Sequence, residues 1–180
     1  MSKKKVLFIG HMYPEEGQKS EKNYDFCKRL VGEGGMEIFL LSDAWNKISD
    51  GVSSVSDKFE ELLEAKVFKE KYYVDPIQTS NSDMGILALY YKIKRKHTFD
   101  LVIISDIQDY LMLANIICNA EERIAILQYE VWYAGLFDDY AMELFYYCVI
   151  NAELLLTTPD NCTYLSEYEF IREKLRVIDP

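Results

Sequence analysis

The sequence lacks the short motifs that mark the commonest nucleotide-binding and hydrolytic α/β proteins. The loop after its first apolar segment, residues 10–20, contains neither GxGxxG nor GxxxxGK[ST]. Glu15 and Glu16 in that loop would repel a phosphate brought to the start of the following helix. No serine stands in a GxSxG pattern. We therefore expect neither a nicotinamide or ATP site in this loop nor a hydrolase-type catalytic triad.

Cysteine is also scarce, and no two cysteines form a CxxC pair. The four are Cys27, Cys118, Cys148 and Cys162. In apolar or helical contexts and without a signal peptide, they predict reduced core residues of a cytoplasmic protein rather than a metal site. Long apolar runs are absent too, because the best candidate, residues 144–157, is interrupted by Asn151 and Glu153. A membrane-spanning helix is therefore not expected.

Positive charge is in short supply. The 180 residues carry 20 Lys and Arg against 30 Asp and Glu, a net charge of −10. Nucleic-acid binding needs clustered cations, so no nucleic-acid partner is expected. Two small basic clusters, residues 3–5 and 92–96, fit a solvated N-terminus and the polar end of a helix, and a peripheral contact with a membrane or another anion is the alternative. His97 fits favourable placement at that negative helix end.

What the sequence does contain is a regular alternation of apolar runs and helical patterns. Half of its residues are apolar (49%), which excludes a disordered chain. We predict strands over residues 5–10, 36–41, 66–74, 100–105, 123–128, 154–157 and 176–179. We predict helices over residues 20–33, 80–96, 107–120, 137–152 and 159–173, the first of them ended by Gly34-Gly35. Residues 42–57 fit a loop, and residues 59–65 fit one or two helical turns.

This rhythm predicts a doubly wound α/β fold, with a mostly parallel sheet and helices on both faces, in a single Rossmann-like domain over residues 1–180. Ligands of such sheets bind beyond the carboxyl ends of the strands. His11 directly follows the first strand, where its imidazole could act as an acid or base or hydrogen-bond a substrate hydroxyl; the alternative is that it only orders its own loop.

Two later strand ends also carry candidate residues. Asp106 follows Ser105 at the end of the strand over 100–105, and it fits either a ligand contact or the cap of the next helix. Glu130 stands between Tyr129 and Trp132 after the strand over 123–128. A carboxylate among aromatic rings suits sugar binding, because the rings stack on pyranose faces and the carboxylate accepts from hydroxyls. Aromatic packing beneath a loop is the alternative.

The same segments, in the same order, resemble the N-terminal domain of GT-B glycosyltransferases, particularly the retaining family 4 that uses nucleotide-sugar donors. The matching segments are residues 4–10, 34–38 ("GGMEI", like "RGHEV"), 99–103 ("FDLVI", like "fDvvh"), 123–132 ("RIAILQYEVW", like a strand ending in "HD-x-W"), 152–158 ("AELLLTT", like "ADxvixxS") and 176–180 ("RVIDP", like "kvxviPxG"). The chain departs from the family in two places. Tyr129 replaces the usual histidine, and only Gly17 remains of the usual Gly-Gly in the first loop.

The resemblance implies an acceptor-binding half of a glycosyltransferase that is incomplete for catalysis alone. The nucleotide-sugar donor would bind mainly a C-terminal GT-B domain, supplied in cis or in trans, so no cofactor or metal is expected in this half. The acceptor would be a sugar or glycan. His11 and Glu130 would be catalytic, with Glu130 orienting a hydroxyl and His11 donating a hydrogen bond. The substrate-binding residues would be Gly17, Ser105, Asp106, Tyr129 and Trp132.

Two other interpretations remain open from the residues alone. One is a non-catalytic, flavodoxin-like or receiver-like binding or regulatory domain. A receiver needs an acidic cluster directly after its first strand, and Glu15 and Glu16 come late in the loop for that role. The other is a hydrolase or nucleotide-binding enzyme without a familiar motif.

Overall fold

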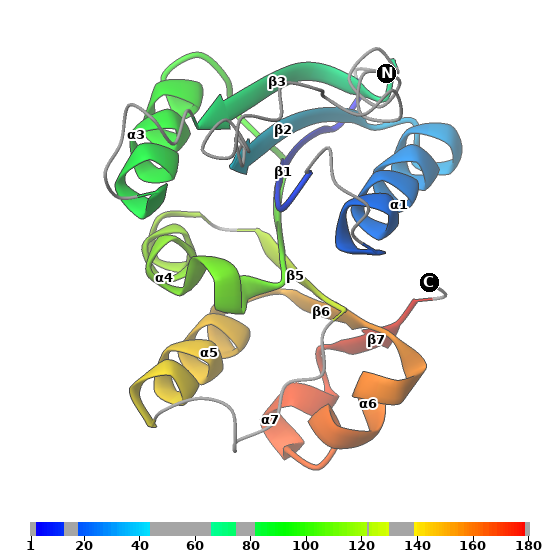
Figure 1. Ribbon diagram of the computed structural model, residues 1–180. Coiled ribbons are helices and arrows are strands. Elements are labelled where there is room, and N and C mark those ends of the chain that lie inside the picture. The colour runs from blue at the N-terminus through cyan, green and yellow to red at the C-terminus, as the bar shows by residue number, and fades with distance from the viewer. Residues whose placement is uncertain are drawn as a thin grey trace, which may run out of the picture. The chain divides into compact units, whose positions relative to one another are not determined.

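The computed structural model describes residues 3–12, 18–43, 66–74, 82–121, 123–129 and 139–178. The chain forms two compact units, Met1–Asp100 (the first unit) and Leu101–Pro180 (the second unit). Figure 1 shows the elements of each, and each unit is described by itself.

The first unit is built around three parallel strands in the order β3-β2-β1. Its elements are β1 (Lys5–Ile9), α1 (Gln18–Gly34), β2 (Glu37–Asp43), β3 (Phe68–Val74) and α3 (Ser82–Lys94). Figure 1 shows α1 on one side of these strands and α3 on the other. Residues 6–9 of β1 and residues 38–41 of β2 are apolar and buried, as expected for strands covered on both faces.

Gly35 explains where α1 stops. Its φ of +59° lies in the left-handed region, which glycine enters without a steric penalty. The amide of Met36 then donates to the carbonyl of Leu30 at 3.4 Å, and Glu37 enters β2. The Gly34-Gly35 pair thus ends the helix as the sequence predicts.

The second unit contains four parallel strands in the order β4-β5-β6-β7. Its elements are β4 (Leu101–Ser105), the 3₁₀ turn η2 (Ile107–Tyr110), α4 (Leu111–Ala120), β5 (Ile124–Gln128), α5 (Asp139–Asn151), β6 (Leu154–Thr157), α6 (Pro159–Leu165), α7 (Glu169–Arg172) and β7 (Leu175–Val177). Helices α4 and α5 pack directly against each other. All residues of β5 are buried, as expected for a strand with neighbours on both sides.

The predicted parallel α/β fold with helices on both faces is confirmed, and two predicted helices need correction. The helix predicted over 159–173 is two short helices, α6 and α7, separated at residues 166–168. The Arg172 guanidinium donates to the Ser166 carbonyl through Nε (3.1 Å) and through a terminal nitrogen (3.0 Å), which stabilises the break. The helix predicted over 107–120 begins with the 3₁₀ turn η2. Ser42 and Asp43, predicted in a loop, belong to β2, and residues 44–65 lie outside the described residues.

The cysteines are free, as predicted, and Cys27, Cys118 and Cys148 are buried, whereas Cys162 is half-buried. Among the described residues, no group of three or more His, Cys, Asp or Glu could hold a metal ion. Over the same ranges, no helix is both long enough and apolar enough to cross a membrane.

Candidate functional site at the carboxyl ends of the strands

The carboxyl ends of the second unit's strands carry a group of polar side chains that are buried. Its members are Ser105, Asp106, Gln128, Thr157 and Asn161, each at most 1% exposed, with Tyr129 beside them at 7%. Buried polar groups cost free energy unless they are hydrogen-bonded. Asp106, Thr157 and Asn161 make side-chain hydrogen bonds to neighbouring strand ends, and we refer to these contacts as the strand-end network.

Asp106 joins β4 to β5 in this network. Its φ of +46° turns the backbone into the left-handed region, which Asp tolerates better than most residues. Its amide donates to the Leu127 carbonyl at 2.7 Å. Its carboxylate oxygen Oδ1 accepts a hydrogen bond from the Tyr129 amide at 2.9 Å. Asp106 therefore fixes the backbone at the point where the chain leaves β5.

Thr157 and Asn161 join β5 to β6 in the same way. The Thr157 hydroxyl donates to the carbonyl of Gln128 at 2.8 Å, and the Asn161 amide nitrogen lies 3.4 Å from the same oxygen. The Thr157 carbonyl in turn accepts from the Ile178 amide at 2.8 Å, just beyond β7. The ends of β4, β5, β6 and β7 are thus linked in sequence.

The corresponding strand end of the first unit holds His11. The amide of Gly10 donates to the Leu41 carbonyl at 3.2 Å, and the amide of Met12 donates to the Ser42 hydroxyl at 3.0 Å. Asn23 on α1 donates to the His11 carbonyl at 3.0 Å. The backbone on both sides of His11 is therefore held in place, while its side chain is partly exposed. This arrangement suits either of the roles considered for His11.

A hydrogen bond connects two of the predicted site residues, Asp106 and Tyr129, and Ser105 precedes Asp106 at the end of β4. His11 lies in the first unit. Gly17, Glu130 and Trp132 lie outside the described residues. The roles predicted for all seven stay predictions.

Sequence reasoning missed the residues that hold these strand ends together: Asn23, Ser42, Gln128, Thr157 and Asn161. One signal was available, because Gln128 and Thr157 are polar residues at the end of otherwise apolar strands. Asn23 and Asn161 gave no such signal, since a polar residue on a helix normally faces water. Their hydrogen bonds to carbonyls on other elements appear only in the folded chain.

The helical stretch after Asp106 begins with the turn η2, so Asp106 stands directly before η2 and not before α4. Helix α4 begins at Leu111, and the residue before it, Tyr110, makes no side-chain cap hydrogen bond. The Asp106 Oδ1 accepts a hydrogen bond from the Tyr129 amide at the end of β5. The role of Asp106 as a cap of the turn that follows it stays a prediction.

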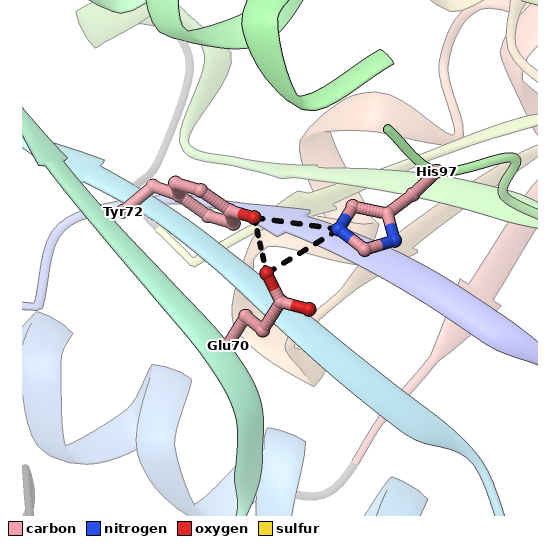
Figure 2. Close-up of polar contacts among 3 residues, drawn as sticks. All are labelled: Glu70, Tyr72 and His97. Carbon is pink, nitrogen blue, oxygen red and sulfur yellow. Dashed lines mark hydrogen bonds and ion pairs between the residues drawn. The ribbon is translucent and has the colours of Figure 1, made fainter. Parts of the chain in front are cut away.

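His97 lies at the end of α3, as predicted, and its ring makes contacts that were not predicted. Its amide donates to the Ile93 carbonyl at the end of α3 (3.0 Å), but its ring contacts β2 and β3 rather than the helix end. The ring lies 4.7 Å from that of Phe39, centroid to centroid. Nε2 lies 3.3 Å from a Glu70 carboxylate oxygen and 3.4 Å from the Tyr72 hydroxyl. Figure 2 shows the three side chains converging.

The hydrogen bond between Glu70 and Tyr72 shifts the pKa of both side chains. Glu70 and Tyr72 are two residues apart on β3 and therefore share a face. The Tyr72 hydroxyl donates to the Glu70 carboxylate. This hydrogen bond holds the pKa of Glu70 below its usual value. Burial and the same hydrogen bond raise the pKa of Tyr72 to about 12. Tyr72 therefore stays a protonated donor, and the Glu70–Tyr72–His97 cluster ties β3 to the segment after α3.

Comparison with solved structures gives a consistent picture of the fold. The structure of apo UGT2 from Phytolacca americana matches 98% of this chain, with a TM-score of 0.61 at 10% identity. Anabaena Alr3699/HepE in complex with UDP matches 97%, with a TM-score of 0.53 at 14% identity. The same protein in complex with UDP and glucose matches 97%, with a TM-score of 0.55 at 14% identity. No protein-family model matches the sequence, and no curated protein matches it.

These likenesses show a glycosyltransferase-like fold. The chain spans about half the length of the solved structures it matches, 52% of the first and 43% and 44% of the other two. At 10–14% identity they establish the fold alone.

Proposed function

We propose that this chain is the acceptor-binding N-terminal part of a nucleotide-sugar-dependent glycosyltransferase of the GT-B type. The observation that carries the proposal is the match of almost the whole chain to about half of several glycosyltransferase-like structures. A chain of that extent corresponds to one of two halves, and the nucleotide-sugar donor would bind mainly to the other half. The proposal includes membership of the retaining glycosyltransferase family 4.

The neighbours also bear on the class of ligand. The Anabaena protein binds UDP in one of its structures and UDP with glucose in another. UDP-glucose is therefore the first donor to test with the present protein. The strand-end network supports a ligand-binding role for this edge, because its hydrogen bonds fix the backbone at Tyr129, directly before Glu130.

Within this proposal, His11 donates a hydrogen bond to the acceptor and Glu130 orients the attacking hydroxyl. Tyr129, Gly17 and Trp132 contact the sugar. The buried Asp106 acts indirectly. Its carboxylate accepts a hydrogen bond from the Tyr129 amide and so positions Tyr129. The donor-binding groups and the other half of the cleft are supplied by a C-terminal domain in cis or in trans.

The test is sugar transfer by the full gene product that carries this chain. The protein is incubated with UDP-glucose or other UDP-sugars and a panel of saccharide acceptors, and mass spectrometry measures the addition of one hexose. We expect transfer by the wild type and a loss of about 100-fold in kcat for His11→Ala and for Glu130→Gln, since each removes a polar contact with the reacting groups. His97→Gln changes the only other histidine and serves as the matched control, with unchanged transfer.

Two results would contradict the proposal at different levels. Absence of transfer and of donor hydrolysis with every UDP-sugar, from a folded protein, would overturn the function. Wild-type transfer by the double variant His11→Ala/Glu130→Gln would leave the function in place and overturn the site.

A further inference from the structure

Two cysteines from different helices meet at the carboxyl ends of α4 and α5. The thiol of Cys118 donates to the backbone carbonyl of Cys148 across 3.7 Å. The residue after Cys118 and the residue before Cys148 are also in contact: the Tyr147 hydroxyl donates to the Asn119 side-chain oxygen at 2.5 Å. The two helices are therefore held together by polar contacts at the level of both cysteines.

The two thiols differ in environment. Cys148 is fully buried, whereas Cys118 keeps 8% of its surface exposed, so a small reagent reaches Cys118 first. A hydrogen bond from the Cys148 thiol and the nearby Lys174 ammonium lower the pKa of Cys118, while the same contact and burial raise the pKa of Cys148. Cys118 is therefore the more readily ionised of the two thiols, and a thiol attacks as its thiolate.

Lys174 is held in place beside this pair. Its ammonium donates to the Val149 carbonyl at 3.1 Å and to the Ile150 carbonyl, both in the last turn of α5. These contacts satisfy carbonyl groups that lack partners at a helix end. They also fix a positive charge close to Cys118, which stabilises a thiolate there.

We propose that Cys118 and Cys148 form a reversible intramolecular disulfide when the protein meets a hydroperoxide. The Cys118 thiolate attacks a peroxide oxygen, the O–O bond breaks, and the leaving hydroxide takes up a proton to become water, which leaves Cys118 as a sulfenic acid. The Cys148 sulfur then attacks the Cys118 sulfur, the S–O bond breaks, and a second water leaves. Two thiols lose two electrons in total, and hydrogen peroxide is reduced to two waters.

The other two cysteines provide internal controls. Cys27 is fully buried in α1, and burial raises the pKa of its thiol. Cys162 is half-buried in α6. Neither makes the cysteine–cysteine contact that joins α4 to α5. A disulfide is therefore expected between Cys118 and Cys148 and not at these sites.

The disulfide would tie α4 to α5 and close a loop of chain that contains β5 and Tyr129. A cross-link of this kind stabilises mainly by restricting the unfolded chain. We expect the thermal midpoint to rise by about 5–10 °C on oxidation.

The experiment treats the folded protein with a small excess of hydrogen peroxide, blocks the remaining thiols with iodoacetamide under denaturing conditions, and maps peptides without reduction. We expect a linked Cys118–Cys148 peptide, lost after a dithiol reductant, with Cys27 and Cys162 alkylated. Cys27→Ser and Cys162→Ser should retain the link, and Cys118→Ser and Cys148→Ser should each abolish it. A folded, peroxide-treated wild type without that peptide would overturn the proposal.

A second measurement keeps the proposal testable if removal of either cysteine disturbs packing. In Cys148→Ser or Cys148→Ala the sulfenic acid at Cys118 cannot be resolved, so dimedone should label Cys118 in preference to the remaining cysteines. Preferential labelling of Cys27 or Cys162 would contradict the assignment of Cys118 as the attacking sulfur.

Discussion

The carboxylate of Asp106 accepts a hydrogen bond from the backbone amide of Tyr129 across 2.9 Å, so a side chain at the end of β4 fixes the backbone at the end of β5. Both residues are buried, and Asp106 adopts a φ of +46°. A carboxylate in a left-handed turn is thus held by an interstrand contact. Four predictions concern the contacts and turns that position the strands.

Asp106→Ala should lower the free energy of unfolding by about 1–3 kcal/mol, because it leaves the buried Tyr129 amide without this acceptor and puts alanine at a positive φ. Asp106→Asn should lower it less, since the asparagine oxygen can still accept and Asn tolerates this backbone conformation. Urea denaturation measures both. Asp25→Ala, at an exposed position of α1, is the control. A loss for Asp106→Ala no larger than that of the control would contradict the structural role of this contact.

Thr157→Val should lower the free energy of unfolding by about 1 kcal/mol, because it keeps the shape of the side chain and removes the hydroxyl that donates to Gln128. The same measurement on Thr163→Val, at an exposed position of α6, should show little change. Equal stability of the two variants would show that the link between β5 and β6 does not depend on this hydroxyl.

Gly35→Ala and Gly32→Ala should change the stability of the protein in opposite directions. Alanine at position 35 must adopt a φ near +59°, so the substitution should destabilise the protein by about 1 kcal/mol. Gly32 lies inside α1 with no atom within 4 Å of an added Cβ. Alanine there should stabilise by about 0.5–1 kcal/mol through its helix propensity. Thermal unfolding of both variants checks the pair, and a stabilising Gly35→Ala would contradict the left-handed end of the helix.

The contribution of the Tyr72–Glu70 hydrogen bond to the free energy of unfolding should depend on pH at both low and high pH. The pKa of Tyr72 is raised from 10.0 to about 12, so its contribution to stability is complete below pH 10 and is lost as the pH rises through 12. The pKa of Glu70 is lowered from 4.5, so its contribution is present above pH 4.5 and is lost as the pH falls through the lowered value.

The free energies of unfolding of wild type and Tyr72→Phe should therefore differ most between these two pH limits, and the difference should shrink outside them. Tyr91→Phe, at an exposed position of α3, is the control and should show no such pH-dependent difference. A difference between wild type and Tyr72→Phe that stays constant up to pH 12 would contradict the shift of Tyr72.

The sequence predicted the strands and most helices because each is determined locally. Residues 6–9, directly before Gly10, are all apolar, as a strand covered on both faces requires, and Gly34-Gly35 marks a helix end by itself. The break between α6 and α7 was not predicted, because it depends on Arg172 reaching back to the Ser166 carbonyl. Short helices of this kind are decided by such contacts and not by periodicity.

The sequence predicted where the candidate site lies but not which contacts hold it together. The rule for parallel sheets selected the strand ends, and so it selected Asp106 and Tyr129. It could not indicate that Asp106 faces a neighbouring strand, nor that Asn161 on α6 supports the end of β5. Contacts between residues some thirty positions apart, such as Thr157 and Gln128, depend on strand order, which the alternating pattern does not fix. The contacts of the His97 ring were not predicted for the same reason, since Glu70 on β3 approaches it only after folding.

The strand-end network links the four strands of the second unit at one edge. The ends of β4, β5, β6 and β7 are bound to one another through Asp106, Thr157, Asn161 and the Ile178 amide, so the backbone at Tyr129 is held by a side chain of the neighbouring strand end. Residues 130–138 follow this anchored position directly in the sequence. Within the proposed function, a library randomised over those nine positions is a practical starting point for testing their part in acceptor choice.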